Sequence, residues 1–394
     1  MKKLLLATAA TALVGAPAMA QESIKLGVML GFTGPAESLA PMMAEGAELA
    51  MREVSETGLL LGGTTVESVR ADSQCSGEMG RSAAERLITS DRVSGIVGAL
   101  CSGATIPALV NVAVPNGMVM ISPSATSPAL STIEDNGLFF RTAPSDARQG
   151  VVRAEVLLEQ DINEVAVTYT NNDYGKGLAD SFEAAFTELG GTVTLNAPHE
   201  DGKADYSAEI GALAAAGGQR LVVAGYIDQG GPGIIRAALD SGAFDTFHLP
   251  DGMIGDALTD RFGSEIDGST GQHPGSDSPG FAAYTELATA AGFDGTAAFS
   301  PEGYDAAALI LLAMQAAGST DPQVYKEHVM NVANAPGEVI LPGELGKALQ
   351  ILADGGEINY EGASAVEFIG GGESAGSYRQ IEVRDGVIST VQYR

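Results

Sequence analysis

The stretch GALCSGATIPALVNVAVPNGMVMISPSAT, residues 98–126, decides the fold of this chain. It contains the ends of two short apolar segments, 95–100 and 118–121, with a helical pattern at 104–112 between them. A strand, a helix and a second strand in this order are typical of a parallel sheet whose strands are connected by helices. The stretch therefore predicts an α/β fold.

The same alternation extends along most of the chain. It restarts with a helical pattern at 147–158, so we expect two successive α/β units. The expected strands are 24–30, 66–71, 95–100, 118–121, 164–169, 192–195, 220–224 and 246–249, and the expected helices are 40–54, 80–88, 104–112, 147–158, 177–189, 206–216 and 233–239.

The sequence changes character after Gly263. The segment SEIDGSTGQHPGSDSPG, residues 264–280, is rich in Gly, Ser and Pro and is interpreted as a connection. Two helical patterns follow at 281–291 and 304–317, and the second is apolar on nearly every side, which predicts a buried helix. The sequence RDGV at 384–387 predicts a hairpin between two alternating strands. Together these features indicate a chain that crosses between two domains more than once.

Residues 1–20 are predicted to be a secretory signal peptide. Two lysines precede an apolar stretch at 4–14, and the small residues of the segment 18–20 (AMA) are typical of a cleavage site. The residue directly after the cleavage site is Gln21 and not a cysteine, so a lipid anchor is not expected. No later stretch has the roughly 18 unbroken apolar residues of a membrane span. We expect export as a soluble protein.

The two cysteines, Cys75 and Cys101, both lie in the exported part. An even pair in an oxidising compartment predicts a disulfide bond. Two separate thiols are the alternative.

The charge excludes one class of partner. The chain has 21 Lys and Arg against 50 Asp and Glu, a formal net charge of −29. Loss of the two signal-peptide lysines leaves 19 basic residues against the same 50 acids, a charge of −31. Such a surface favours solubility and repels nucleic acid, so no nucleic-acid partner is expected.

Motifs of common enzyme classes are missing from the sequence. It has no phosphate-binding P-loop, no dinucleotide fingerprint and no zinc-protease motif. The histidines at 199, 248, 273 and 328 lack metal-ligand spacing. We therefore expect no catalysis, no cofactor and no metal.

Small hydroxyl residues follow both apolar segments of the opening stretch. Ser102 comes after the first, and Ser124 and Thr126 come after the second. In an open α/β sheet, ligands bind outside the carboxyl ends of the strands, where free backbone N–H groups of helix starts favour an anion such as a carboxylate. Each residue taken singly is explained as well by helix capping. Two such positions after consecutive strands favour a shared ligand.

Longer stretches resemble a known family. The sequence DSQCSGEMGRSAAERLI, the opening stretch, NNDYGKGLADSFEAAFTELGG, YDAAALILLAMQAAGS and INYEGASAVEF are similar to the leucine/isoleucine/valine-binding proteins, which are type I periplasmic solute receptors of ABC importers. The resemblance implies two Rossmann-like α/β lobes with parallel central sheets, joined by three crossovers. It implies a first lobe of residues 21–141 and 272–368 and a second of 142–271 and 369–394. It also implies the Cys75–Cys101 disulfide.

The resemblance assigns ligand contacts in the first lobe. Ser102 and Thr126 match positions that bind the carboxylate and ammonium of an amino acid. Ser124 matches a position whose carbonyl binds the ammonium, and Ala125 lies between them in the same loop. The family often has an aromatic residue where this chain has Leu39, so the apolar end of the pocket differs.

In the second lobe, Tyr174 matches an aromatic lining residue and Tyr226 a residue near the ammonium. Asp251 matches an acidic ammonium partner that is often Glu in the family, and Asp has a shorter reach.

The implied function is a monomeric periplasmic receptor that delivers a neutral, branched-chain or other aliphatic amino acid to the permease subunits of an ABC importer. An amide, urea or aromatic-acid receptor is an alternative in the same class. A sensory module for a signalling receptor and an exported hydrolase are alternatives in other classes.

Overall fold

A five-stranded parallel sheet forms the core of the first lobe. The computed structural model describes residues 22–394, and within them the strand order of this sheet is β2-β1-β3-β4-β5. Its strands are β1 (Ser23–Leu30), β2 (Thr65–Asp72), β3 (Ile96–Gly98), β4 (Met120–Ser122) and β5 (Phe139–Arg141). The signal peptide predicted for residues 1–20 lies outside the described residues.

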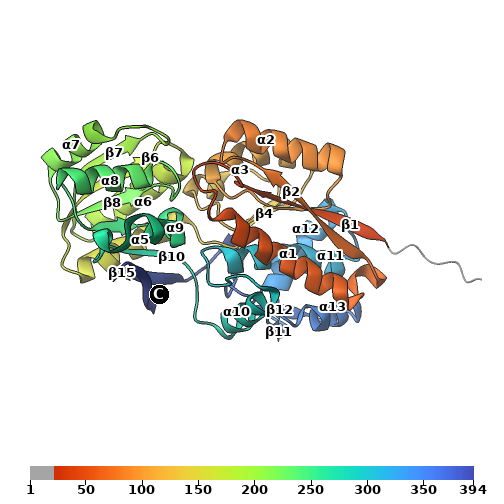
Figure 1. The fold of residues 1–394 in the computed structure, drawn as a ribbon. Helices are drawn as coiled ribbons and strands as arrows, with labels where there is room; N and C mark the ends of the chain where they lie inside the picture. Colours follow the sequence, from red (N-terminus) through yellow and green to blue (C-terminus); the bar gives the residue numbers. More distant parts are fainter. Residues whose placement is uncertain (1–21) are drawn as a thin grey trace, which may run out of the picture.

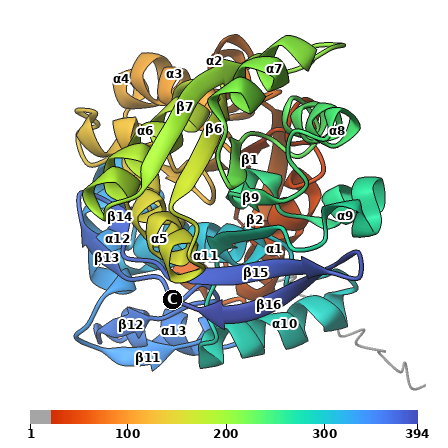
Figure 2. The ribbon, with the colours of Figure 1, turned by 90° about the vertical axis from the view of Figure 1, so that its left-hand side faces the viewer.

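The second lobe is built on a seven-stranded sheet of order β16-β15-β10-β9-β8-β6-β7. Strands β6 to β10 are parallel, and the β15–β16 hairpin adds an antiparallel edge (Figure 2). Its strands are β6 (Glu164–Thr170), β7 (Thr192–His199), β8 (Arg220–Ala224), β9 (Phe247–Leu249), β10 (Thr270–Pro274), β15 (Tyr378–Arg384) and β16 (Val387–Tyr393).

Helices cover both faces of the first sheet. Successive side chains of a strand point to opposite faces, and the apolar side chains on each face pack against helices. Val28 of β1 belongs to the core shared with α1 and α11, whereas Met29 belongs to the core shared with α2 and α3 (Figure 1). The helices of this lobe are α1 (Ala40–Thr57), α2 (Gly77–Arg86), α3 (Ser102–Ala108), α4 (Val114–Asn116), α10 (Pro279–Ala291), α11 (Ser300–Ala317), α12 (Pro322–Ala333) and α13 (Leu345–Ala353).

The second sheet is covered in the same way. The side chains of Phe182 and Phe186 pack with Val165 and Val167 on one face, and those of Ile210 and other residues pack on the opposite face. The helices are α5 (Asp146–Glu159), α6 (Asp173–Glu188), α7 (Ser207–Ala216), α8 (Gly231–Ser241) and α9 (Asp256–Phe262).

The chain passes between the two lobes three times. It crosses from β5 to α5, returns from β10 to α10, and crosses again from β14 to β15. The small strands β11 (Glu338–Ile340), β12 (Ile358–Tyr360), β13 (Phe368–Gly370) and β14 (Glu373–Ser374) precede the last crossing. This arrangement confirms the predicted fold class of two α/β lobes joined by three crossovers, while the exact lobe boundaries stay a prediction.

Two expectations about single elements have opposite outcomes. The buried helix expected at 304–317 is confirmed, because α11 is buried along almost its whole length. The connection expected at 264–280 is wrong in its middle, where β10 forms an inner strand of the second sheet. Its sequence, TGQHP, is polar, yet every residue is buried between β9 and β15, so no apolar pattern marked it as a strand.

No helix in residues 22–394 combines the length and apolar character needed to cross a membrane.

Candidate functional site

A small cavity lies between the two lobes, at the carboxyl ends of their parallel strands. It has a free volume of about 10 Å³, and ten residues line it. The first lobe contributes Leu39, Leu100, Cys101, Ser102, Ser124 and Phe299, and the second contributes Tyr174, Tyr226, Asp251 and Gly252. Six of the eight residues predicted from the sequence therefore meet here; Ala125 and Thr126 are buried beside Ser124 in the chain but do not line the cavity.

The turn after β3 brings Ser102 to the cavity. Gly98 has φ +139°, and a side chain there would lie 2.1 Å from the carbonyl oxygen of Met29, so the tight turn needs glycine. The hydroxyl of Ser102 accepts a hydrogen bond from the backbone N–H of Ser127 (3.1 Å). It donates none within residues 22–394, which leaves its hydrogen available to a ligand.

The loop after β4 is fixed by its own hydroxyl groups. Ser122 donates to the carbonyl of Ala99 (2.7 Å) and accepts from the N–H of Ala125 (2.9 Å). Ser124 donates to the carbonyl of Leu100 (3.0 Å). These bonds hold the two loops against each other. The hydroxyl of Thr126 is buried and has no partner among the described residues.

Helix capping does not explain these side chains. The residue before α3 is Cys101, and no side chain caps that helix. Ser127, not one of the predicted residues, caps the short 3-10 helix Pro128–Thr132.

The predicted disulfide is confirmed. Cys75 and Cys101 are bonded, with their Cα atoms 5.2 Å apart. The bond ties the loop after β2 to the loop that carries Ser102.

Arg141, at the end of β5, anchors the loop after β4 from behind. Its side chain is fully buried and donates to the carbonyls of Ala125 (3.1 Å) and Ser127 (3.0 Å) and to the hydroxyl of Ser131 (2.8 Å). It also forms a bidentate pair with Glu373 of β14, with distances of 2.7 to 3.2 Å. The same guanidinium therefore links the cavity loop to the last crossover.

The second lobe contributes a pair of stacked aromatic rings. Tyr174 lies in the first turn of α6, and Tyr226 follows β8; their ring centroids are 5.0 Å apart and their planes differ by 20°. The hydroxyl of Tyr226 is buried without a partner among residues 22–394. That group is available to a ligand.

Asp251 follows β9 at the start of the 3-10 helix Asp251–Met253. Its carboxylate accepts hydrogen bonds from the phenol of Tyr174 (2.6 Å), the N–H of Gly252 (2.6 Å) and the amide of Gln149 (2.9 Å). Burial raises the pKa of Asp251, and these three donors oppose the rise. The donors hold the carboxylate at the cavity wall.

The sequence analysis missed a buried polar row on α5. Asp146, Gln149 and Arg153 lie three and four residues apart, so they share one helix face. Neither carboxylate oxygen of Asp146 has a partner among the described residues. Burial and the charge of Asp251 raise the pKa of Asp146 well above its usual value, and burial lowers the pKa of Arg153 to about 10. The spacing of Gln149 and Arg153 within the helix predicted at 147–158 places them on one face, and this spacing could have identified the row from the sequence.

The apolar end of the cavity consists of Leu39, Leu100 and Phe299. Leu39 also reaches the second lobe, since a Cβ on Gly255 would lie 3.4 Å from its methyl group. Phe299 has a left-handed backbone (φ +64°), which is uncommon for an aromatic residue. No pattern in the sequence predicted that Phe299 lines the cavity.

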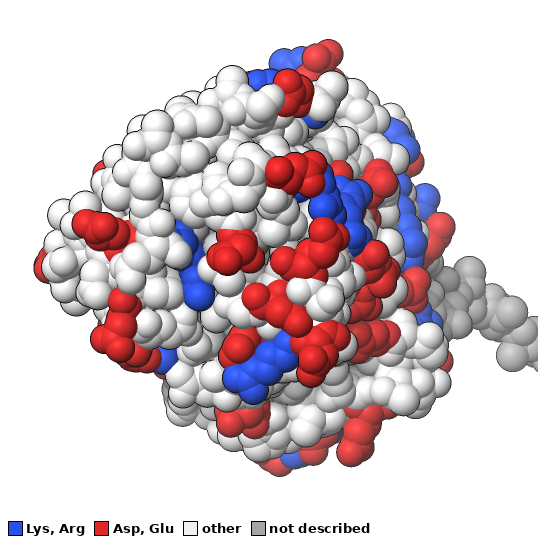
Figure 3. Space-filling model, turned by 60° about the vertical axis from the view of Figure 1, so that its left-hand side comes forward, with Lys and Arg blue, Asp and Glu red and all other residues white. Residues whose placement is uncertain are grey.

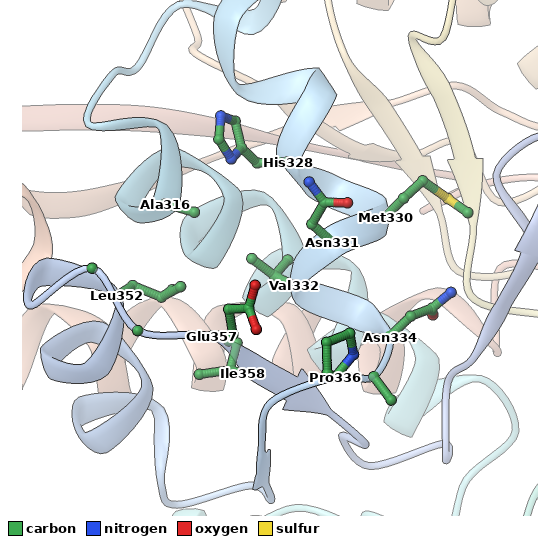
Figure 4. Close-up of a pocket in the computed structure, with 13 residues that line it drawn as sticks. Ala316, His328, Met330, Asn331, Val332, Asn334, Pro336, Leu352, Glu357 and Ile358 are labelled. Carbon is green, nitrogen blue, oxygen red and sulfur yellow. The ribbon is translucent and has the colours of Figure 1, made fainter.

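A larger hollow lies away from the lobe interface (Figure 4). It has a volume of about 570 Å³ and lies around the ends of α11 and α12 and the start of β12, with His328, Asn331 and Glu357 on its walls. It lacks the convergent buried polar groups of the interlobe cavity. Within residues 22–394, no group of three His, Cys, Asp or Glu residues is placed to hold a metal.

Residues 23–335 match the model of the periplasmic binding protein family. A Leu/Ile/Val-binding protein homologue from Brucella melitensis biotype 1 is 30% identical over 328 residues, covering 82% of this chain and 86% of that protein. The chain belongs to the Leu/Ile/Val-binding family of periplasmic binding proteins. An amino acid binding protein from Pseudomonas aeruginosa is 28% identical over 263 residues, covering 66% of this chain and 69% of that one.

Solved structures of other binding proteins share the fold. The leucine binding protein LivK from Thermotoga maritima matches with a TM-score of 0.80 at 23% identity, covering 94% of this chain and 98% of that one. A solute binding protein from R. palustris, in complex with benzoate, matches with a TM-score of 0.75 at 16% identity, covering 94% and 96%. Family membership makes a binding protein, rather than an enzyme, the natural interpretation.

Proposed function

We propose that this protein is a periplasmic receptor that binds a neutral aliphatic amino acid, of the branched-chain type or similar, and delivers it to an ABC importer. The carrying observation is that one cavity has a polar end with the buried carboxylate of Asp251 and an apolar end of Leu39, Leu100 and Phe299.

The polar end favours a zwitterion. Asp251 lines the cavity, and the charge of the buried Asp146 acts on it. A buried anion is stabilised by a cation, so a ligand ammonium beside Asp251 lowers the cost of burying these acids. The free hydroxyl hydrogen of Ser102, which lines the cavity, suits a ligand carboxylate. Each such charge-assisted hydrogen bond contributes about 1.5–3 kcal/mol.

An aromatic acid is the second candidate. Tyr174, Tyr226 and Phe299 give the cavity aromatic walls, and related structures from R. palustris contain benzoate and 4-hydroxybenzoate. A ligand with only a carboxylate would bring a second anion close to Asp251, whose charge is opposed by Arg153 alone among the described residues, and this weakens the candidate. The melting screen tests amides and urea, and deletion of the coding sequence tests a sensory role for the same site.

The test is a melting screen on the mature protein after removal of co-purified ligand by unfolding and refolding. The panel contains leucine, isoleucine, valine, acetamide, urea, benzoate and 4-hydroxybenzoate. A ligand at about 100 times its Kd stabilises the folded state by about 2.7 kcal/mol, so true ligands raise the melting temperature clearly. We expect aliphatic amino acids to give the largest shifts. A shift with benzoate or acetamide alone would refute the proposal.

A transport role is tested separately in the source organism. Deleting the coding sequence is expected to abolish high-affinity uptake of the amino acid that binds. Unchanged uptake together with a lost transcriptional or chemotactic response would favour the sensory role.

A further inference from the structure

One aspartate of the second lobe is bonded to the first lobe by three hydrogen bonds. Asp228 follows β8, and Ser38 lies between β1 and α1. The N–H and the hydroxyl of Ser38 both donate to Oδ2 of Asp228, each at 2.9 Å. The N–H of Asp228 donates to the carbonyl of Pro35 (3.1 Å). A single residue thus links two loops that belong to different sheets.

This link lies outside the cavity but next to residues that line it. Neither Ser38 nor Asp228 lines the interlobe cavity. Leu39 directly follows Ser38, and Tyr226 lies two residues before Asp228, and both of them line it. The Ser38–Asp228 pair therefore holds the backbone next to one cavity-lining residue of each lobe.

The link depends on the relative position of the lobes. The loop of Ser38 moves with the first sheet and the loop of Asp228 with the second, so rotation of the lobes apart breaks all three bonds. Hydrogen bonds within each lobe survive such a rotation. A second interlobe bond, from the hydroxyl of Ser127 to the carbonyl of Asp173 (2.9 Å), uses a backbone acceptor. Among these contacts, the carboxylate of Asp228 is the acceptor that a side-chain substitution can remove.

We propose that Asp228 and Ser38 form a closure latch: they hold the lobes together around a bound ligand and position Leu39, without touching the ligand. This inference rests on the proposed function, because it assumes that the ligand binds in the interlobe cavity. A ligand that binds only when the lobes are closed has an apparent affinity proportional to the closed fraction. Loss of the latch lowers that fraction and speeds ligand release.

The first arm of the test is leucine binding, measured by calorimetry and by stopped-flow release. Asp228→Ala is expected to weaken the leucine Kd about tenfold, equal to about 1.4 kcal/mol, mainly through a faster off-rate. Ser38→Ala removes one donor and is expected to have a smaller effect, and the double variant is expected to be less than additive. The matched control is Asp240→Ala, because Asp240 is an exposed acid at the end of α8 whose ion pair lies within its own lobe.

A purely structural role gives a different pattern. It lowers the melting temperature of the ligand-free protein, whereas loss of the latch leaves that temperature equal to that of Asp240→Ala. Asp228→Ala with the same leucine Kd and off-rate as Asp240→Ala would overturn the proposal.

The second arm needs no ligand. Ser38→Cys combined with Asp228→Cys is expected to form an interlobe disulfide under mild oxidation, detected as a linked peptide by mass spectrometry. Ser38→Cys alone is the control. Cross-linking without leucine binding to the wild type would support the latch and refute the proposed function alone. Failure to cross-link, with or without leucine, would overturn the latch.

Discussion

The phenol of Tyr174 donates a 2.6 Å hydrogen bond to the carboxylate of Asp251, although the two residues lie 77 positions apart, on α6 and after β9. Both side chains are buried, and both line the interlobe cavity. The tyrosine hydroxyl holds one carboxylate oxygen while Gln149 holds the other. These hydrogen bonds therefore hold the carboxylate of Asp251 in place at the cavity, where it can still interact with a ligand.

Replacing Asp251 by Asn is expected to weaken ligand binding strongly. The substitution keeps the shape and removes the charge, so a ligand ammonium in a closed cleft loses its partner. Truncating one side of such a buried pair costs about 2–5 kcal/mol, or roughly thirtyfold to several-thousandfold in Kd. Tyr174→Phe removes only a positioning hydrogen bond and should cost less, about 0.5–1.5 kcal/mol. Calorimetry with the best ligand measures both, and an unchanged Kd for Asp251→Asn would remove Asp251 from the site.

The buried Asp146 gives a prediction about pH. Its pKa is raised by burial and by the charge of Asp251, so the ligand-free folded state favours its protonated form. Its contribution to folding stability is therefore present below the ordinary pKa of Asp and is lost as pH rises through the raised value. Asp146→Asn is expected to flatten the decline in ligand-free melting temperature from acid to neutral pH. Parallel wild-type and variant curves would contradict the assigned burial.

The ligand is expected to reverse this trend. An ammonium favours the ionised carboxylates, so the affinity of the wild type should rise as pH rises through the raised pKa of Asp146. Titrations over a series of pH values test this expectation, with Asp146→Asn as the matched variant that shows a weaker dependence. Affinity that falls with rising pH in the same range would argue against a ligand cation.

Arg141 is expected to be the ion-pair residue most sensitive to substitution. It is fully buried, and Glu373 balances its charge. Removing one partner of a buried pair costs about 3–5 kcal/mol, because the other charge stays buried. Arg141→Met should destabilise the protein by about this amount, whereas Arg70→Met, at a partly exposed pair with Glu45 and Glu48, should cost less than about 1 kcal/mol. Denaturant unfolding of the two variants compares them, and equal losses would contradict the anchoring role of Arg141.

The disulfide should contribute to stability without being needed for the fold. It closes a loop with a sequence separation of 26, for which chain-entropy estimates give about 3 kcal/mol. Cys75→Ser combined with Cys101→Ser is expected to lower the free energy of unfolding by this amount. The reduced wild type should behave like the double variant, and a difference between the two would indicate an effect of the serines themselves.

Most of the architecture could be predicted from the sequence, but less of the candidate site could. Alternating apolar strands and amphipathic helices predicted both lobes, because each parallel strand is buried and each helix covers one face. The strand β10 was not predicted, since TGQHP has no apolar pattern and is buried only because β9 and β15 flank it. Burial by partners distant in sequence cannot be seen in a local pattern.

The site residues divide in the same way. Ser102 and Ser124 were predictable because they directly follow strands, and Tyr174, Tyr226 and Asp251 were found through the family resemblance. Asp146 was missed because a charged residue at a helix start is usually a solvated one, and here the two lobes bury it. Phe299 was missed because it lies outside the predicted helix 304–317, at the position directly before α11.

The central claim is that the cavity recognises both charges of an aliphatic amino acid. The most direct measurement is calorimetric titration of ligand-free mature protein with leucine and with 4-methylpentanoate, which has the same carbon skeleton and carboxylate but no ammonium. We predict micromolar or tighter binding of leucine, about −8 kcal/mol or better, and at least a hundredfold weaker binding of 4-methylpentanoate, since it would bring a carboxylate close to Asp251 without an ammonium to pair with it. Binding of 4-methylpentanoate as tight as that of leucine would contradict the account.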